Sequence, residues 1–260
     1  MRKFSYTFGL FLYICAVLYL GIYPRVRILP VAFDASFIFH TVGFFILYLF
    51  LLDRLKHKLL SLLIALLVAI LIELLQGYLP SRSRSFADLV YDITGILLAL
   101  IVGFRGKDVV FKILASVMGI GYSPIAPGTI ASFVFSIVIY LSSRYRVIYV
   151  WQISLLLMPI SLFVSQKMED LEGEDPKRCV VDEVLGMSIP LVFLKSNPLL
   201  YALSFLFFRF FDIVKPFGIK NIERIKGGLG IILDDVVAGV YALFLIKAAT
   251  FFLSYFGIRF

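Results

Sequence analysis

Residues Phe4 to Tyr23 read FSYTFGLFLYICAVLYLGIY, a run of 20 positions without a charged side chain. A helix of about 20 apolar residues is long enough to cross the hydrocarbon core of a bilayer. Arg2 and Lys3 precede the run, as basic residues do in a signal peptide, but the apolar core of a signal peptide has only about 7 to 15 residues. We therefore expect an uncleaved first transmembrane helix here.

The rest of the chain has the same character. Of its 260 residues, 61% are hydrophobic and 16% are charged, whereas about a quarter of the residues in an average soluble domain are charged. This composition excludes a water-soluble enzyme. It predicts an all-α fold, a polytopic integral membrane bundle of about 7 to 9 membrane segments. The further apolar runs cover 36 to 52, 59 to 75, 88 to 104, 129 to 141, 147 to 165, 184 to 194, 198 to 211 and 231 to 256.

The charges indicate how the chain is oriented. The formal net charge is +8, and the basic residues are scattered through short loops, which argues against nucleic acid as a partner and suits an anionic membrane surface. If the N terminus is cytoplasmic, 16 of the 25 Lys and Arg residues fall in inside loops and 8 in outside loops, as the positive-inside rule requires. We expect a multi-pass protein surrounded by membrane lipids, in a bacterial-type cytoplasmic (inner) membrane. The runs at 184 to 194 and 198 to 211 could be two crossings or one re-entrant hairpin.

The acidic residues are concentrated in one stretch. Of 17 carboxylates, 11 lie between Glu169 and Asp235. Five of these border apolar runs, at the ends predicted to be cytoplasmic: Asp182, Glu183, Asp212, Asp234 and Asp235. Carboxylates that converge at one depth repel one another unless a cation holds them, and hard oxygen ligands favour Mg²⁺ or Ca²⁺. The alternative is that acids simply favour the N-terminal ends of helices, where they meet the helix dipole.

A second polar segment precedes the run at 129 to 141. It contains Ser123, Gly128 and Thr129 among several glycines and prolines. Free backbone amides at a helix N terminus, with hydroxyl groups nearby, attract a phosphate. Glycine and proline also mark ordinary turns at the membrane interface, so that interpretation stays open at this point.

Four sequence blocks resemble the phosphatidylglycerophosphatase A family over roughly residues 110 to 256. They are SPIAPGT at 123 to 129, EDP at 174 to 176 with VDEVLG at 181 to 186, FRFFDIVKP at 208 to 216, and GGLGIILDDVVAG at 227 to 239. The resemblance implies a Mg²⁺-dependent phosphatidylglycerophosphatase, a lipid phosphate monoester hydrolase of glycerophospholipid biosynthesis that converts phosphatidylglycerophosphate to phosphatidylglycerol at the cytoplasmic membrane face. One departure is Gly218, where the family usually has a second proline.

Roles for the residues follow from the resemblance and from the chemistry of phosphate monoesters, whose negative charge must be neutralised during attack on phosphorus. Arg209 and Lys215 are expected to hold phosphate oxygens, with Thr129, the Gly128 amide and Ser123 on the other side. One acid is expected to orient water, or to form an aspartyl-phosphate instead. The expected metal ligands are Asp182, Glu183, Asp212, Asp234 and Asp235, with Asp175 as a further candidate.

Intramembrane carboxylates are also compatible with two other classes of protein. An ion-coupled membrane transporter would use intramembrane carboxylates to bind a cation, but its usual inverted repeat is absent from this sequence. A non-catalytic membrane scaffold would carry an inert acidic cation site. The sequence leaves the oligomeric state open.

A boundary is expected near Gly103 to Asp108, giving a four-helix membrane domain at 1 to 108 and the phosphatase-like membrane domain at 109 to 260. The first domain resembles the VanZ-like family over roughly 30 to 105. The residues that carry this resemblance are His40, Glu73, Gln76, Arg82, Arg84, Asp88, Asp92 and Gly95. The departures are Asp92, where Asn is common, and Ser36-Phe37, where Asp-Lys is usual. These side chains would form either ion pairs that fasten two helices or a polar site open to the outside for a lipid head group.

The orientation generates a labelling prediction. A cysteine introduced at Ser196 should react with a membrane-impermeant thiol reagent added from outside, because the loop between 194 and 198 is outside if both short runs cross. A cysteine introduced at Gly173 should stay unlabelled in sealed cells and react after permeabilisation. The reverse pattern would invert the orientation, and protection at both positions would favour a re-entrant hairpin.

Overall fold

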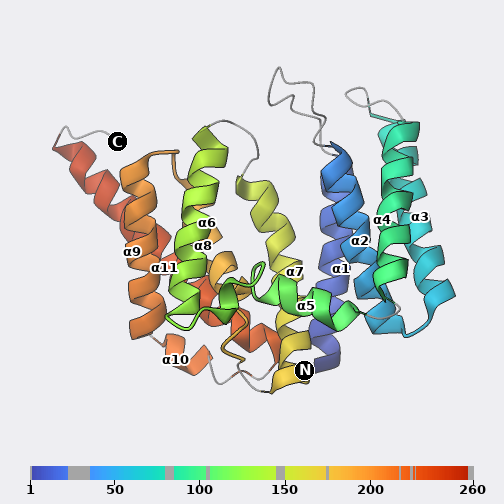
Figure 1. The fold of residues 1–260 in the computed structure, drawn as a ribbon. Coiled ribbons are helices and arrows are strands. Elements are labelled where there is room, and N and C mark those ends of the chain that lie inside the picture. The colour runs from blue at the N-terminus through green and yellow to red at the C-terminus, as the bar shows by residue number, and fades with distance from the viewer. Residues whose placement is uncertain are drawn as a thin grey trace. The chain divides into compact units, whose positions relative to one another are not determined.

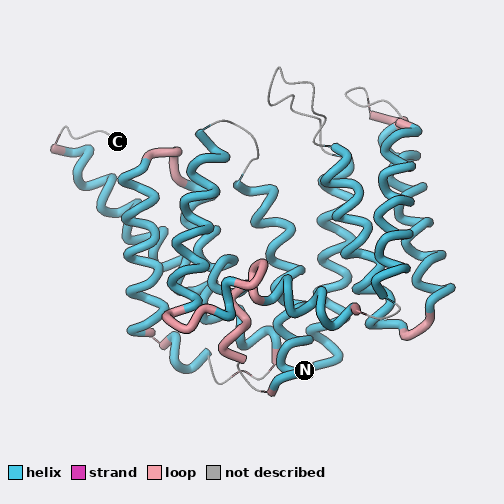
Figure 2. The backbone as a smooth tube through the Cα atoms, viewed as in Figure 1, coloured by secondary structure: helices cyan, strands magenta, loops and turns pink. Residues whose placement is uncertain are grey.

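A computed structural model describes most of the chain, and every regular element in its described part is helical, as expected for an all-α fold (Figures 1 and 2). The chain forms two compact units. One comprises Tyr6–Val110, and the other comprises Phe111–Phe260 together with Met1–Ser5. The described residues are 2–22, 36–79, 85–103, 106–144, 150–173, 176–216, 218–222, 225 and 227–256.

Four long helices make the N-terminal unit. They are α1 (Arg2–Ile22), α2 (Ser36–Leu55), α3 (Lys58–Gln76) and α4 (Phe86–Gly103). Helix α2 packs against both α3 and α4. It approaches α4 closely at Gly95, where a Cβ atom would overlap the backbone carbonyl of Thr41. The Tyr13 hydroxyl donates a hydrogen bond of 3.0 Å to the Gly43 carbonyl and so ties α1 to α2.

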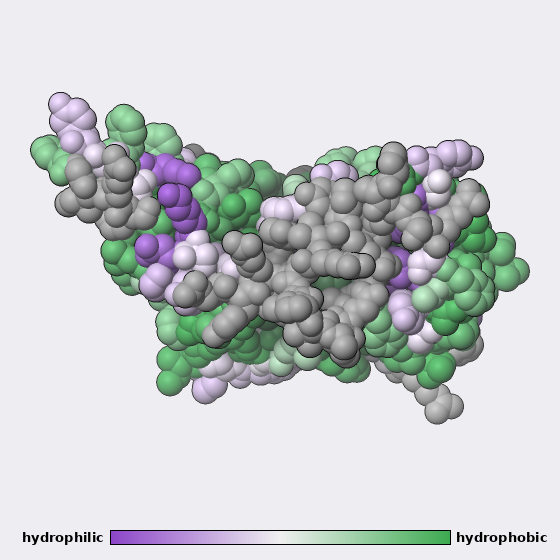
Figure 3. All heavy atoms as spheres, turned by 90° about the horizontal axis from the view of Figure 1, so that it is seen from above, coloured by the Kyte–Doolittle hydropathy of each residue, from purple (hydrophilic) through white to green (hydrophobic). Residues whose placement is uncertain are grey.

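The outer faces of these helices are apolar. On α3, Leu59, Leu63, Leu67, Ile70 and Leu74 recur every three or four residues and are all exposed. A stripe of large exposed side chains is unfavourable in water and favourable in lipid. The space-filling view likewise shows hydrophobic residues over much of the visible outer sides of the helices (Figure 3).

The C-terminal unit is built around α8. Its elements are α5 (Lys107–Ala115), the 3₁₀ turn η1 (Ile120–Tyr122), α6 (Pro127–Arg144), α7 (Val150–Glu172), α8 (Val181–Phe193), α9 (Pro198–Val214), α10 (Ile219–Ile222) and α11 (Gly228–Tyr255). Helix α8 contacts α6, α7, α9 and α11. Nine of its 13 residues are buried, so most of its apolar surface contacts protein rather than lipid.

Five helices in the described part of the chain are long and apolar enough to cross a membrane: Phe4–Ile22, Phe37–Leu55, Lys58–Gln76, Phe86–Gly103 and Gly228–Tyr255. Pro127–Ser143 is a shorter apolar helix. The chain is thus a helical protein with several membrane-spanning candidates, fewer by this measure than the 7 to 9 segments expected from the apolar runs. The difference arises in the C-terminal unit, where the 13 residues of α8 extend only about 20 Å at 1.5 Å per residue.

Two glycines let α8 and α11 cross at close range. A Cβ atom at Gly186 would lie 2.6 Å from the Asp235 carbonyl oxygen, and one at Gly239 would overlap the Gly186 carbonyl. Small residues allow helix backbones to approach in this way. Because Asp182 and Asp235 each lie one helical turn before these glycines, the crossing brings the two carboxylates together.

The crossing predicts the effect of one added methyl group. Gly239→Ala should force α8 and α11 apart and lower the melting temperature of the purified protein by several degrees, since overpacking costs about 1–3 kcal/mol. Gly43→Ala is the matched control, because a Cβ at Gly43 has nothing within 4 Å. Equal melting temperatures for the two variants would contradict the role given to the crossing.

Candidate active site

The five predicted carboxylates lie on three helices of the C-terminal unit. Asp182 and Glu183 are in the first turn of α8, Asp212 is in the last turn of α9, and Asp234 and Asp235 are near the start of α11. Helices α8 and α9 are joined by a short turn and run in opposite directions, so the start of α8 and the end of α9 lie at the same end of the unit (Figure 1).

Ion pairs connect the three helices. Arg209 Nη1 lies 2.6 Å from Asp212 Oδ2 on its own helix and 3.8 Å from Glu183 Oε1 on α8. Lys215 Nζ donates a hydrogen bond of 2.7 Å to Asp234 Oδ2 on α11. The basic residues predicted to hold phosphate therefore stand among the predicted metal ligands.

Asp235 is the centre of the negative charge. The charges of Asp212, Asp182, Asp234 and Glu183 all act on it, and its side chain is only 4% exposed. Carboxylates held this close in a buried place repel one another strongly, because little water screens them.

Several polar atoms in this cluster have no hydrogen-bond partner. Oδ1 of Asp234 and Oδ1 of Asp235 are buried acceptors without a donor, and Nε of Arg209 is a buried donor without an acceptor. A buried polar group that lacks a partner costs about 1–3 kcal/mol, and more if it is charged. A cation could satisfy the carboxylate oxygens of Asp234 and Asp235, and an anion could satisfy the Arg209 nitrogen.

The donor set suits a hard divalent cation. It consists of carboxylate oxygens, which Mg²⁺ prefers. No group of three His, Cys, Asp or Glu side chains in the described ranges is already gathered closely enough to hold a metal ion. A Mg²⁺ ion bound here would therefore need further ligands from water or from substrate phosphates.

The N terminus of α6 meets the cluster at Gly128. A Cβ atom there would overlap the Glu183 carboxylate, so glycine is what allows α6 to approach that side chain. Thr129 follows in the same turn of α6. The Ser123 hydroxyl is engaged within its own turn, where it donates a 3.1 Å hydrogen bond to the Ile125 carbonyl. Asp175 lies outside the described residues.

Gln166 was not among the predicted site residues, yet it positions the start of α11. Its Oε1 accepts a hydrogen bond of 2.9 Å from the Gly228 amide, and its Nε2 donates one of 3.0 Å to Glu169. The residue is fully buried on α7. The sequence feature that could have identified it is its position between the apolar run at 147 to 165 and the acidic residues that follow.

Cys179 lies close to the cluster but is not suited to attack phosphorus. Burial, and then the charge of Asp182, raise the pKa of its thiol well above the ordinary value. The thiolate is the nucleophilic form, so Cys179 remains a protonated, buried group beside Ser165, whose hydroxyl lies 3.4 Å away.

These features define a helical membrane protein with a buried site of carboxylates and cations, the set that phosphoryl-transfer chemistry uses. Residues 113–250 match the family model described as phosphatidylglycerophosphatase A. Since the match spans just over half of the chain, the chain belongs to the phosphatidylglycerophosphatase A family, and it is an enzyme of that class. Its resemblance to the VanZ-like family remains a prediction.

Curated relatives agree with this family. A protein of Bacteroides thetaiotaomicron, described as a putative phosphatidylinositol-3-phosphatase, is 39% identical over 140 residues, which cover 50% of this chain and 87% of the relative. Phosphatidylglycerophosphatase A of Escherichia coli is 35% identical over 137 residues, 50% of this chain and 77% of the relative. The Haemophilus influenzae protein of the same name is 35% identical over 97 residues, 36% of this chain and 60% of the relative. No solved structure gives a significant match.

The contact between Gly128 and Glu183 predicts a sharp steric effect. Gly128→Ala should displace the Glu183 carboxylate, weaken its interaction with Arg209 and lower phosphatase activity by about tenfold or more, as small misplacements in active sites do. Gly106→Ala is the control, because a Cβ there meets only ordinary contacts at 3.7 Å or more. Full activity in the Gly128 variant would remove Glu183 from the site.

Proposed function

We propose that this protein removes the terminal phosphate of phosphatidylglycerophosphate to give phosphatidylglycerol, with Mg²⁺, at the cytoplasmic face of a bacterial inner membrane. One observation carries the proposal: the same buried cluster contains carboxylate oxygens without donors and an arginine nitrogen without an acceptor. A metal ion together with a phosphate group would satisfy both at once.

Asp182, Asp234 and Asp235 are the proposed metal ligands, because all three are buried and their charges act on one another, and oxygens of water and phosphate would complete the ligand set. Bound there, Mg²⁺ would neutralise phosphate charge and make phosphorus more open to attack. Asp212 and Glu183 are more exposed and pair with Arg209, so their first role is to hold that guanidinium in place.

Arg209 supplies phosphate recognition. Its planar guanidinium carries donors on several nitrogens, which suits the oxygens of a phosphate group. Lys215 acts as a point charge beside it. The Lys215 backbone adopts a left-handed conformation at the end of α9, with φ of 48°, and its ammonium group binds Asp234, which joins the phosphate-binding side of the cluster to the metal-binding side.

The cytoplasmic placement rests on the distribution of charge. Lys167 at the end of α7 and the basic pair Lys177 and Arg178 before α8 lie along the chain next to the carboxylate end of the unit. Basic residues stay on the cytoplasmic side during insertion, and phosphate would therefore be released into the cytoplasm.

A second substrate is favoured by one comparison. The relative from Bacteroides thetaiotaomicron is described as a putative phosphatidylinositol-3-phosphatase, and phosphatidylinositol 3-phosphate is likewise a membrane-bound phosphate monoester. The carboxylate and arginine chemistry would serve either lipid, so a head-group comparison belongs in the same assay.

The test is phosphate release by the purified full-length protein in lipid nanodiscs. With Mg²⁺, phosphatidylglycerophosphate should be hydrolysed, and Asp182→Asn and Asp235→Asn should each lower the rate by about 100-fold or more, as expected when a metal ligand or base is removed. EDTA should abolish activity and Mg²⁺ should restore it. Faster hydrolysis of phosphatidylinositol 3-phosphate would reassign the substrate but not the site.

The matched control is Glu172→Gln. Glu172 is a carboxylate of the same unit that lies 2.9 Å from Lys112, outside the cluster, so its removal should leave the rate within about twofold. Full activity in EDTA, or in both aspartate variants, would overturn the proposal.

A further inference from the structure

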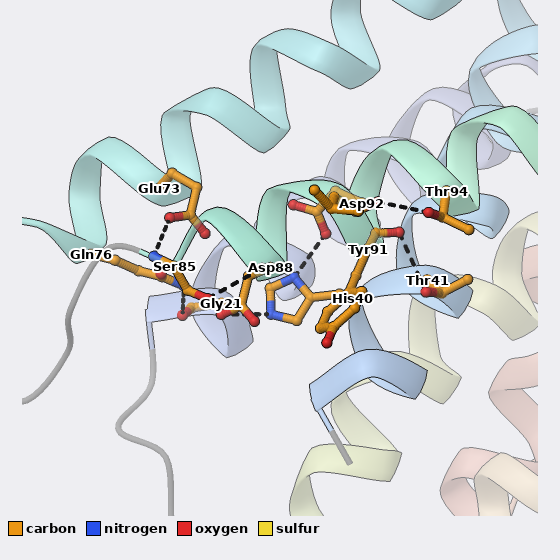
Figure 4. A network of polar contacts seen from close by, with 11 residues as sticks. Gly21, His40, Thr41, Glu73, Gln76, Ser85, Asp88, Tyr91, Asp92 and Thr94 are labelled. Atoms are coloured by element: carbon orange, nitrogen blue, oxygen red, sulfur yellow. Dashed lines mark hydrogen bonds and ion pairs between the residues drawn. The ribbon is translucent and has the colours of Figure 1, made fainter. Parts of the chain in front are cut away.

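The N-terminal unit contains a polar cluster that the candidate active site does not use (Figure 4). His40 Nδ1 on α2 lies 2.7 Å from Asp92 Oδ1 on α4, and His40 Nε2 lies 3.7 Å from Asp88 Oδ2. These contacts join α2 to α4. The expected ion-pair partners Arg82 and Arg84 lie outside the described residues, and a head-group site here stays a prediction.

In the C-terminal unit, the start of α6 and the end of α9 meet at the candidate active site. Gly128 lies so close to Glu183 that a Cβ atom there would overlap the carboxylate. Arg209 Nη1 lies 3.8 Å from Oε1 of the same carboxylate. Both residues thus approach one side chain, which places the first turn of α6 beside the last turns of α9.

Aromatic side chains fill the contact between α6 and α9 beyond this point. The ring centroids of Phe133 and Phe205 are 5.4 Å apart, and those of Tyr140 and Tyr201 are 5.6 Å apart. The residue number rises along α6 as it falls along α9, so the two helices are antiparallel neighbours, as they also lie in Figure 1.

Thr129 and Arg209 occupy the next positions along this contact. Each lies about one helical turn from the Phe133–Phe205 pair, toward the carboxylate end of the unit. The packed rings leave no room for a phosphate further along the two helices. A phosphate held by Arg209 therefore lies where the aromatic packing ends, and it has to arrive from the end or the outer side of the contact.

The outer face of α9 beside Arg209 is apolar. Leu206, Phe210 and Ile213 lie within about one turn of Arg209 and are 58%, 53% and 68% exposed, whereas the Arg209 side chain is 14% exposed. On α6, Ile130 is exposed as well. The guanidinium thus lies at the border between the buried carboxylate cluster and a surface that suits lipid.

A lipid phosphate needs both of these surroundings at once. Its acyl chains are stable in apolar surroundings, because bringing each CH₂ group into water costs free energy, whereas its phosphate is stabilised by cationic donors. Arg209 offers such a donor, since its Nε is buried and has no acceptor. A lipid beside α9 can therefore bring its phosphate to Arg209 while its chains stay in the bilayer.

We propose that the lipid substrate enters laterally from the bilayer, at the edge where the start of α6 meets the end of α9. Its phosphate then lies at Arg209, and its acyl chains lie against Leu206, Phe210 and Ile213. This route rests on the proposed function, because it requires a membrane-bound phosphate monoester as the substrate. It makes the three apolar side chains determinants of specificity for a lipid over a water-soluble phosphate.

Photo-crosslinking of the full-length protein in nanodiscs tests the route. The probe is phosphatidic acid, the simplest lipid phosphate monoester, with a diazirine near the glycerol end of one acyl chain. Labelling of residues 206–213 on α9 should fall in excess unmodified phosphatidic acid and persist in excess phosphatidylcholine. Labelling of the exposed Leu63 and Leu67 on α3 should be equal in both, as expected for bulk lipid. Competable labelling elsewhere, or none on α9, would overturn the route.

Kinetics with and without acyl chains give a second measurement. Ile213→Asn should raise the KM for phosphatidylglycerophosphate by about fivefold or more and keep kcat, because an apolar contact with the chains is lost. The deacylated head group, a water-soluble phosphate monoester, should be hydrolysed equally by the variant and the unaltered protein. Leu199→Asn is the matched control, since Leu199 is exposed on the same helix but lies about 21 Å from Ile213 at 1.5 Å per residue.

The two measurements separate the route from the reaction. No phosphate release from phosphatidylglycerophosphate by the unaltered protein would contradict the proposed function, and the crosslinking, which needs no turnover and no variant, would still decide the route. An unchanged KM for the lipid in a folded Ile213→Asn protein, or an equal rise in KM for the deacylated head group, would overturn lateral entry along α9.

Discussion

The close crossing of α8 and α11 is the constraint on which the C-terminal unit depends. Gly186 and Gly239 bring two helix backbones to a distance that no side chain would allow. Lipid gives helices little hydrophobic reason to associate, so the packing of small residues supplies much of the attraction. The crossing has an electrostatic consequence, because it forces Asp182 and Asp235 together one turn away. Backbone packing thereby stabilises a concentration of like charge that would otherwise drive the helices apart.

The same arrangement explains why the candidate active site contains buried polar atoms without hydrogen-bond partners. Arg209 and Lys215 neutralise part of the charge of Asp212, Glu183 and Asp234, but they leave buried oxygens of Asp234 and Asp235 without donors. The N-terminal unit follows a related principle. Gly95 brings α4 against α2, and the carboxylates of α4 meet His40 near this contact. In each unit, glycine contacts create the low-dielectric setting in which charged groups interact strongly.

Much of this could be predicted from particular residues. Asp182, Asp212 and Asp235 were identified because charges that border apolar runs are costly without partners, and the order of the sequence blocks indicated the family to which the chain belongs. Gln166 was missed, because one buried amide near the end of an apolar run has no periodic signal. The expected 7 to 9 membrane segments stay a prediction beside the five candidates in the described residues, because an apolar run such as 184 to 194 looks the same whether lipid or protein surrounds it.

The sequence by itself determined the membrane setting, the helical class and the identity of the acidic residues, since these depend on composition and on local hydrophobicity. Only the tertiary structure decided which residues each acid contacts. The contact of Gly128 with Glu183, the pairing of Lys215 with Asp234 and the bond between His40 and Asp92 each join residues that are distant in the chain. The physical reason is that local patterns fix what a helix is, whereas helix crossings, which depend on the shapes of both partners, fix which charges share a buried space.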